Sequence, residues 1–185
     1  QVEDIRRGEF GSNPQFLTAH GDYVYFAADD GHWGTELWRT DGASRSDVSG
    51  TSGDRSVSGT SLVQDISKQC SARSEAGCTG KCVWNSLAAP PTCETYGLPA
   101  VLSKRPHSSN PRYLCSSAAL GLLFFQADDG AHGAELWKYD GTTATMVKDI
   151  YLGAVGSSPS YIVAFNNQVY FQADDGVNGA ELWRS

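Results

Sequence analysis

The sequence predicts an all-β protein: a partial β-propeller of three blade-equivalents, made of antiparallel four-stranded blades, with a disulfide-stapled loop insertion. Three observations support this prediction: a motif that recurs three times, short apolar segments bounded by turn residues, and four cysteines crowded into one insertion. No segment of useful length shows the 3.6-residue apolar period of an amphipathic helix, so we expect almost no helix. A solenoid or a plain β-sandwich is the alternative architecture.

A repeat of about 46 residues organises the chain. Its centre is Asp-Asp-Gly followed by Glu-Leu-Trp, and the three copies begin at Asp29, Asp128 and Asp174. Asp-Ile and a proline recur upstream of each copy, and the register holds throughout once two insertions are allowed for. We place the repeats at about 4–42, 61–142 and 144–185 of a single domain 1–185, with a flexible loop insertion at 43–60 and a Cys-rich insertion at 67–108.

Each copy contains the pattern of four short strands. In the first copy we expect them at about 15–20, 23–29, 34–40 and 61–66, separated by Gly, Asp and Asn in turns. Four strands in this length match the size of a propeller blade. The chain opens with VEDI, which matches a fourth strand, and closes with ELWRS, which matches a third. We therefore expect two complete blades and one blade divided between the two ends.

Three blade-equivalents are too few to close a ring, because propellers have about four to eight blades. Three arrangements remain open: two chains that combine into six blades, an arc cut from a longer protein, and an open arc whose edges a partner covers. Bare strand edges invite aggregation. Every arrangement points to an assembly, with a protein partner or a second copy of the chain on the open blade edges.

Composition limits the classes of partner. The 185 residues are 40% hydrophobic and 19% charged, with a net charge of −7 and 14 scattered Lys and Arg residues. An acidic chain without a basic patch argues against a nucleic-acid partner. The longest apolar run, 118–125, is far shorter than the roughly 20 residues that span a bilayer. We expect no nucleic acid and no transmembrane segment, while docking on a membrane complex stays open.

The second copy resembles the ELWxxDGT repeat family, a group of tandem repeats in secreted and surface proteins. The match reads Glu-Leu-Trp-Lys-Tyr-Asp-Gly-Thr over 135–142 and continues to Ile150. The first copy departs from the pattern at Ala43, and the third ends at Ser185. The resemblance implies a propeller-like β architecture and a binding or scaffold role, with no shared catalytic site. A likeness of fold does not by itself assign a function.

The Asp-Asp-Gly turns concentrate carboxylates. Oxygen ligands at such short spacing could bind calcium. We favour the other interpretation, in which the Asp side chains accept hydrogen bonds from their own turn and Gly supplies positive φ, because the run recurs in every copy. We therefore expect no cofactor, with calcium as the alternative. The candidate calcium ligands are Asp29, Asp30, Glu36, Asp128, Asp129, Glu135, Asp174, Asp175 and Glu181.

The aromatic residues divide into two groups. Repeated columns of Phe and Trp are what packing between blades requires, since each large ring buries about 150–250 Å². The columns are Phe26, Phe125 and Phe171, and Trp38, Trp137 and Trp183. Trp33, Trp84 and Tyr96 lie outside these columns and are the candidates for partner binding.

The Cys-rich insertion is the most individual feature of the chain. Cys70, Cys78, Cys82 and Cys93 have the spacing C-x7-C-x3-C-x10-C, which suits two disulfides better than the C-x2–4-C pairs of a zinc site. Three pairings are open. Cys115 falls inside a predicted strand, where we expect a buried free thiol, with an intermolecular disulfide as the alternative. The disulfides place the chain in an oxidising compartment: extracellular, periplasmic or an organelle lumen.

No residue is predicted to be catalytic. The sequence has no Ser, His and Asp spacing that suggests a triad, and no GxGxxG, P-loop or HExxH motif. Long loops on rigid scaffolds often carry recognition, so we expect the Cys-rich insertion to contact a partner. The predicted function is a non-enzymatic protein-interaction or scaffold module, an accessory subunit or fragment of a larger assembly. The alternative is a secreted ligand-binding propeller, lectin-like or a calcium-dependent adhesion protein.

Overall fold

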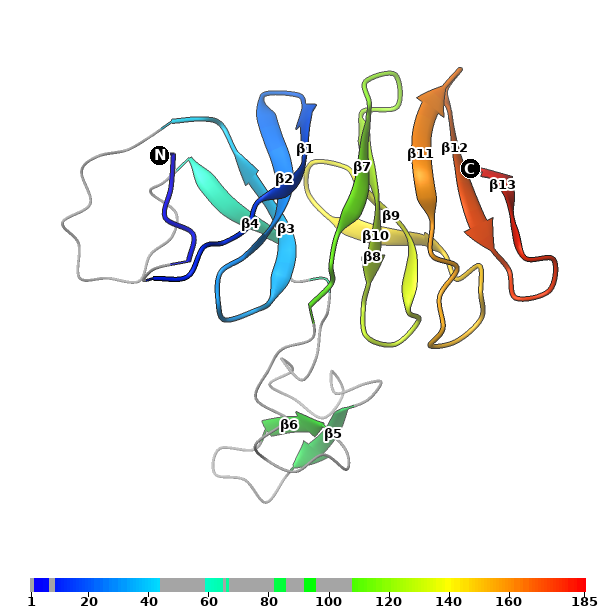
Figure 1. Cartoon of the computed structure of the whole chain (residues 1–185), viewed down its shortest axis with the longest axis horizontal. Coiled ribbons are helices and arrows are strands. Elements are labelled where there is room, and N and C mark those ends of the chain that lie inside the picture. Colours follow the sequence, from blue (N-terminus) through cyan, green and yellow to red (C-terminus); the bar gives the residue numbers. More distant parts are fainter. Residues whose placement is uncertain are drawn as a thin grey trace.

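The computed structural model describes residues 2–6, 9–43, 59–64, 66, 82–85, 92–95 and 108–185 (Figure 1). The chain is all-β: no helix occurs in these ranges, and three antiparallel sheets stand side by side. The two ends of the chain lie at opposite ends of this row, so the sheets form no closed ring (Figure 1). The all-β prediction is confirmed.

Each sheet is a meander in which strands adjacent in the sequence are hydrogen-bonded neighbours. Sheet 1 is β1 (Gln15–His20), β2 (Tyr23–Asp29), β3 (Thr35–Thr40) and β4 (Thr60–Gln64). Sheet 2 is β7 (Arg112–Ser117), β8 (Leu122–Asp128), β9 (Ala134–Tyr139) and β10 (Ala144–Lys148). Sheet 3 is β11 (Ser160–Phe165), β12 (Gln168–Asp174) and β13 (Ala180–Arg184).

The strand predictions for the first repeat agree with the structure to within two residues at each end. The two hairpin strands 15–20 and 23–29 are confirmed, because aromatic and β-branched residues and the intervening Gly-Asp turn define them. The first strand of every sheet carries a β-bulge near its start, between Gln15 and Thr18 in sheet 1. The sequence gives no sign of these bulges.

Part of the Cys-rich insertion forms a separate two-stranded sheet. Its strands β5 (Cys82–Asn85) and β6 (Thr92–Thr95) pair antiparallel, with Trp84 opposite Cys93. The structure shows no disulfide in the ranges that it describes, and the side chains of the four clustered cysteines lie outside those ranges. The disulfide staple therefore stays a prediction. Most of the predicted flexible loop, 44–58, also lies outside the described residues.

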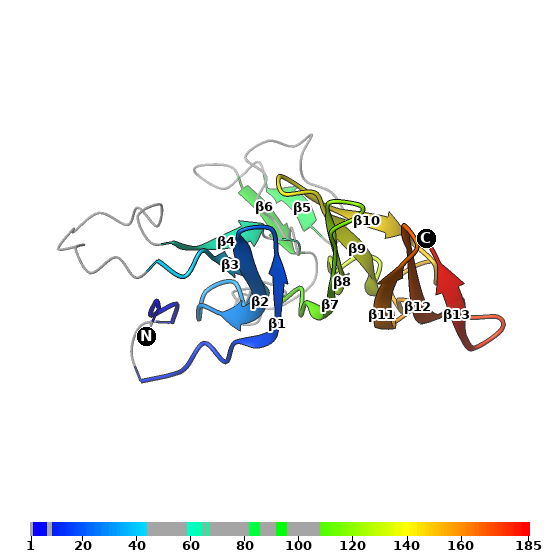
Figure 2. The ribbon, with the colours of Figure 1, turned by 90° about the horizontal axis from the view of Figure 1, so that it is seen from above.

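The hydrophobic core is divided into layers between neighbouring sheets. Tyr25 and Leu37 of sheet 1 share one buried cluster with Phe125 of sheet 2. Leu136 of sheet 2 shares the next cluster with Phe171 of sheet 3. Phe125 and Trp137 lie in the first cluster, and Phe171 and Trp183 in the second, so these members of the predicted columns pack between repeats. Phe26 and Trp38 instead form a third cluster on the other face of sheet 1. The first strands of the three sheets, β1, β7 and β11, follow one another along one side of the row (Figure 2).

Three isoleucines repeat the same contact. Ile66 follows β4 and packs in the layer in front of sheet 2, and Ile150 follows β10 and packs in the layer in front of sheet 3. Ile5, from the opening VEDI segment, packs in the same way on Phe26 and Trp38 of sheet 1. The opening segment thus occupies the place that the end of a fourth strand occupies in the other two layers.

The substitution Leu136→Ala is expected to destabilise the protein by about 3 kcal/mol, because Leu136 is fully buried and its removal leaves a cavity between sheets 2 and 3. Leu182 holds the equivalent position in sheet 3, yet 78% of its surface is exposed. Leu182→Ala should therefore change the free energy of unfolding by less than about 0.5 kcal/mol. Urea unfolding of both variants in dilute solution measures the difference, and equal losses would contradict this layered core.

Candidate interaction site

The paired Asp residues hold the turns in which they lie. In sheet 1, Asp30 Oδ1 accepts hydrogen bonds from the backbone N–H groups of His32 and Trp33 at 2.8 and 2.9 Å. Asp29 Oδ1 accepts one from Gly31 N–H at 2.7 Å. The corresponding aspartates of the other sheets, Asp128, Asp129, Asp174 and Asp175, accept the same bonds. This arrangement is the turn-forming role that the sequence favoured.

These hydrogen bonds shift the pKa values of three residues in the turns. Burial raises the pKa of Asp129, but hydrogen bonds from His132 and Ala131 outweigh it and leave that pKa below its ordinary value. Backbone N–H groups of Asn178 and Val177 lower the pKa of Asp175. The hydrogen bond to Asp129, 2.7 Å from Nδ1 to Oδ2, raises the pKa of His132. Asp129 and Asp175 therefore stabilise the fold in their ionised form.

The carboxylates do not gather into a metal site. Within the described ranges, no three side chains of His, Cys, Asp or Glu are grouped so that they could hold a metal ion. The glutamates of the first two repeats leave the turn altogether, since Glu36 and Glu135 are fully buried between sheets. The calcium alternative therefore has no preformed site in this part of the chain.

Each buried glutamate joins its sheet to the next one. The Glu135 carboxylate accepts hydrogen bonds from Ser157 N–H at 2.8 Å and from Ser157 Oγ at 2.5 Å. It also accepts weaker bonds from the N–H groups of Ile150 and Tyr151, at 3.3 and 3.2 Å. Glu36 accepts the equivalent pair of bonds, from the N–H and the Oγ of Ser109. A buried carboxylate is stabilised only when several donors surround it, so both interfaces depend on this serine.

Backbone contacts complete the arrangement. Ser158 N–H donates to the carbonyl of Ala134 at 2.9 Å, and Asn110 N–H donates to the carbonyl of Thr35 at 3.0 Å. Gly133 of sheet 2 lies so close to the backbone of Val155 and Gly156 that a Cβ there would meet atoms at about 2.6 Å. We call this set of bonds, centred on Glu and Ser, the Glu–Ser contact.

The sequence predicts Glu36 and Glu135 only as alternative calcium ligands, and it predicts no role for the serine. A signal is nevertheless present: a serine recurs two residues before the recurring proline, as Ser12, Ser109 and Ser157. The donor and acceptor are 73 residues apart in one contact and 22 in the other, so spacing alone does not pair them.

A row of aromatic rings runs across the three sheets beside the Glu–Ser contacts. Phe16, Tyr113 and Tyr161 have positive φ angles of 55°, 54° and 53°. The ring centroids of Phe16 and Tyr113 are 6.2 Å apart, and those of Tyr113 and Tyr161 are 6.3 Å apart. Positive φ is costly for bulky residues and persists only where surrounding contacts impose it. The repeated backbone geometry therefore places each ring against the next.

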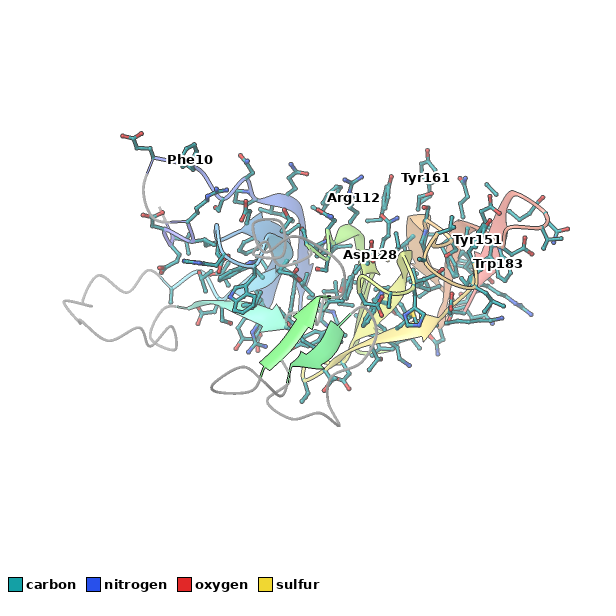
Figure 3. All side chains as sticks on the ribbon, turned by 90° about the horizontal axis from the view of Figure 1, so that it is seen from below. Phe10, Arg112, Asp128, Tyr151, Tyr161 and Trp183 are labelled. Atoms are coloured by element: carbon teal, nitrogen blue, oxygen red, sulfur yellow. The ribbon has the colours of Figure 1, made fainter. Side chains whose placement is uncertain are left out.

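On sheet 3, the acceptor half of the Glu–Ser contact is uncovered. Glu181 is exposed, and no described residue donates a hydrogen bond to its carboxylate. Leu182 is 78% and Tyr161 76% exposed, and Figure 3 shows Tyr161 projecting away from the ribbon. Together with Val163 and Tyr170, these residues line an open hollow of about 410 Å³. We call this surface, formed by Tyr161, Val163, Tyr170, Glu181 and Leu182, the open face of sheet 3.

Sheet 1 presents the donor half at the opposite end. Ser12 is only half-buried and Pro14 is exposed, whereas their counterparts Ser109, Ser157, Pro111 and Pro159 are buried. The Ser12 carbonyl accepts a hydrogen bond from Asp29 N–H at 2.9 Å. The same bond holds Ser109 and Ser157, at 2.9 and 3.0 Å. The serine loop therefore has its docked conformation at the uncovered end as well.

The remaining candidates lie apart from these surfaces. Trp33 is 40% exposed at the turn of sheet 1. The Trp84 side chain and Tyr96 lie outside the described residues. Cys115 is a free, half-buried thiol whose pKa is raised by burial. In the ranges that the structure describes, no helix has the length and apolar character needed to cross a membrane.

The chain was compared with protein-family models, with curated proteins and with solved structures. It matches none of them.

We expect Glu135→Gln to destabilise the protein by about 2–4 kcal/mol, because the amide NH₂ would face donors and leave buried N–H groups without an acceptor. The matched control is Glu181→Gln, the same change at the exposed counterpart, which should cost less than about 0.5 kcal/mol. Both values come from urea unfolding in dilute solution. Equal effects at the two positions would contradict the structural role of the Glu–Ser contact.

The variant His132→Asn is expected to remove one pH-dependent contribution to stability. Because the folded-state pKa of His132 is raised, that contribution is complete below about pH 6.5 and is lost as pH rises through the raised value. Asn178 of sheet 3 shows that Asn fits, since its Nδ2 donates to Asp175 Oδ2 at 2.8 Å. The stability advantage of the wild type over the variant should shrink from pH 6 to pH 8.

Thermal unfolding at both pH values measures this difference, with His32→Asn, at an exposed position of the sheet 1 turn, as the control. An advantage of the wild type that stays constant with pH would show that the Asp129–His132 pair makes no titrating contribution.

Proposed function

We propose that this chain is a non-enzymatic protein-interaction module: an arc of propeller-like blades, related to ELWxxDGT repeats, that works as an accessory subunit or part of a larger assembly. The three sheets supply the blades, and the layers between them supply the rigidity. The Cys-rich insertion is proposed to be disulfide-stapled in an oxidising compartment and to add a second contact with a partner.

One observation carries this proposal. The surface that is fully buried on sheets 1 and 2 is open on sheet 3, as the exposure of Leu182 against that of Leu37 and Leu136 shows. A contiguous apolar surface rimmed by polar groups is typical of a protein–protein interface. Tyr161 and Tyr170 add the aromatic residues that such interfaces favour.

The geometry favours a protein over a small ligand. The hollow is open to solvent, whereas small-molecule sites enclose most of their ligand. The calcium-dependent alternative has less support, because the Asp oxygens accept turn hydrogen bonds and the Glu residues serve the interfaces.

Photo-crosslinking in the producing cells tests this proposal. A photoreactive phenylalanine analogue that replaces Leu182 should form a covalent adduct with a protein, because the proposed partner covers the open face of sheet 3 in the cell. The control is the same replacement at Leu152, which is 81% exposed in the loop between sheets 2 and 3. We expect protein adducts at Leu182 and few at Leu152. If Leu182 gives no protein adduct, the proposed docking surface is wrong.

A further inference from the structure

We propose that the occupant of the open face of sheet 3 is sheet 1 of a second copy of this chain, docked head to tail. This inference rests on the proposed function and names its partner. It places Glu181 of one copy on Ser12 of the other, and so continues the series of Glu–Ser contacts across the boundary between two chains.

The first argument is that the chain already contains this interface twice. Sheet 1 meets sheet 2, and sheet 2 meets sheet 3, through the same buried glutamate, the same serine and the same backbone bond. The acceptor half is left over on sheet 3 and the donor half on sheet 1. A sheet of the same repeat is therefore the one occupant whose fit to this surface the molecule itself demonstrates.

The second argument is that the donor half is already in its docked form. Asn13, which follows Ser12, has a φ of 45°, and its counterparts Asn110 and Ser158 have φ angles of 44° and 49°. Its N–H group is thus set to donate to the carbonyl of Ala180, as Ser158 N–H donates to that of Ala134. Little ordering is required on docking, which favours association.

The third argument comes from the apolar contacts. Tyr113 is 39% exposed where it packs on Tyr161, but Tyr161 is 76% exposed because its row ends there. Phe16 of a second copy would extend the row. Leu182 would enter the layer that Phe26 and Trp38 form with Ile5, as Leu136 enters the layer in front of sheet 3.

The fourth argument concerns the missing strand. Sheets 1 and 2 have four strands and sheet 3 has three, which leaves the outer edge of β13 unpaired. Val2 and Ile5 correspond to Val63 and Ile66 at the end of β4. Ile5 already lies on the face of sheet 1 that would receive sheet 3 of the other copy. Residues 2–5 of the second copy would therefore lie beside β13 as the end of a fourth strand.

Such an interface is heterologous, because different surfaces of the two copies meet. The assembly closes into a ring if the rotations that relate successive copies add up to a full turn. Two copies would then give a ring of six sheets. Six lies within the range of about four to eight blades in closed propellers. If the rotation does not close, the copies form a chain.

Sedimentation equilibrium of the full chain tests this inference. The wild type should exceed the 19.8 kDa mass of one chain, and reach twice that mass or more, at concentrations up to about 100 μM. Glu181→Lys removes the acceptor and should weaken association at least tenfold. Ser12→Glu sets a like charge against Glu181 and should do the same. Asp22→Lys, in the exposed β1–β2 turn, is the charge-matched control and should associate like the wild type.

Mixing the two variants decides the geometry. Glu181→Lys keeps an intact donor end and Ser12→Glu keeps an intact acceptor end, so an equimolar mixture should associate although neither variant does so alone. A dimer formed by two open faces of sheet 3 would resist Ser12→Glu and would give no such rescue. That result, or a wild type that stays monomeric throughout, would overturn the head-to-tail inference.

The two proposals fail separately. If the wild type is monomeric but Leu182 forms adducts with a different protein, the second copy is wrong and the interaction module stands. If Leu182 forms no protein adduct and the chain is monomeric, both proposals are wrong.

Discussion

A carboxylate buried between two β-sheets is the constraint on which this architecture depends. Removing Glu135 from water would be costly unless several donors replaced its hydration, and four groups supply that replacement. Three of these donors are backbone N–H groups, so the loop that carries Ser157 has to approach sheet 2 in one conformation. The apolar layers supply area, whereas the glutamate fixes how one sheet is placed on the next. The two interfaces between sheets therefore share the same arrangement of glutamate and serine.

Much of the fold follows from the sequence because its determinants are local. The aromatic and β-branched residues of Tyr23–Asp29 and the Gly-Asp turn before it define a hairpin without reference to the rest of the chain. The repeated Phe and Trp columns likewise predict packing between repeats. The turn role of Asp30 is also local, since its acceptor bonds span two and three residues. Each of these features could be found in a window of a few residues.

The candidate site could not be found in this way, because its two halves are distant in the sequence. Glu36 lies beside the Asp-Asp-Gly turn in the chain, which suggested a shared role, but its side chain crosses to Ser109 of the next sheet. The positive φ of Tyr113 is equally hidden, since aromatic residues rarely adopt it and it falls in the register shift of β7 between Arg112 and Cys115. Only the recurrence of serine before proline carried information about the interface.

The same Glu–Ser contact closes a loop of 73 residues in one case and of 22 in the other. Chain entropy makes the longer loop costlier by only about 1 kcal/mol. The Glu–Ser contact has the same pair of serine bonds across either separation. The length and content of the segment between glutamate and serine can vary widely at small thermodynamic cost. Such a scaffold can accept new recognition loops without redesign of the surfaces that hold its sheets together.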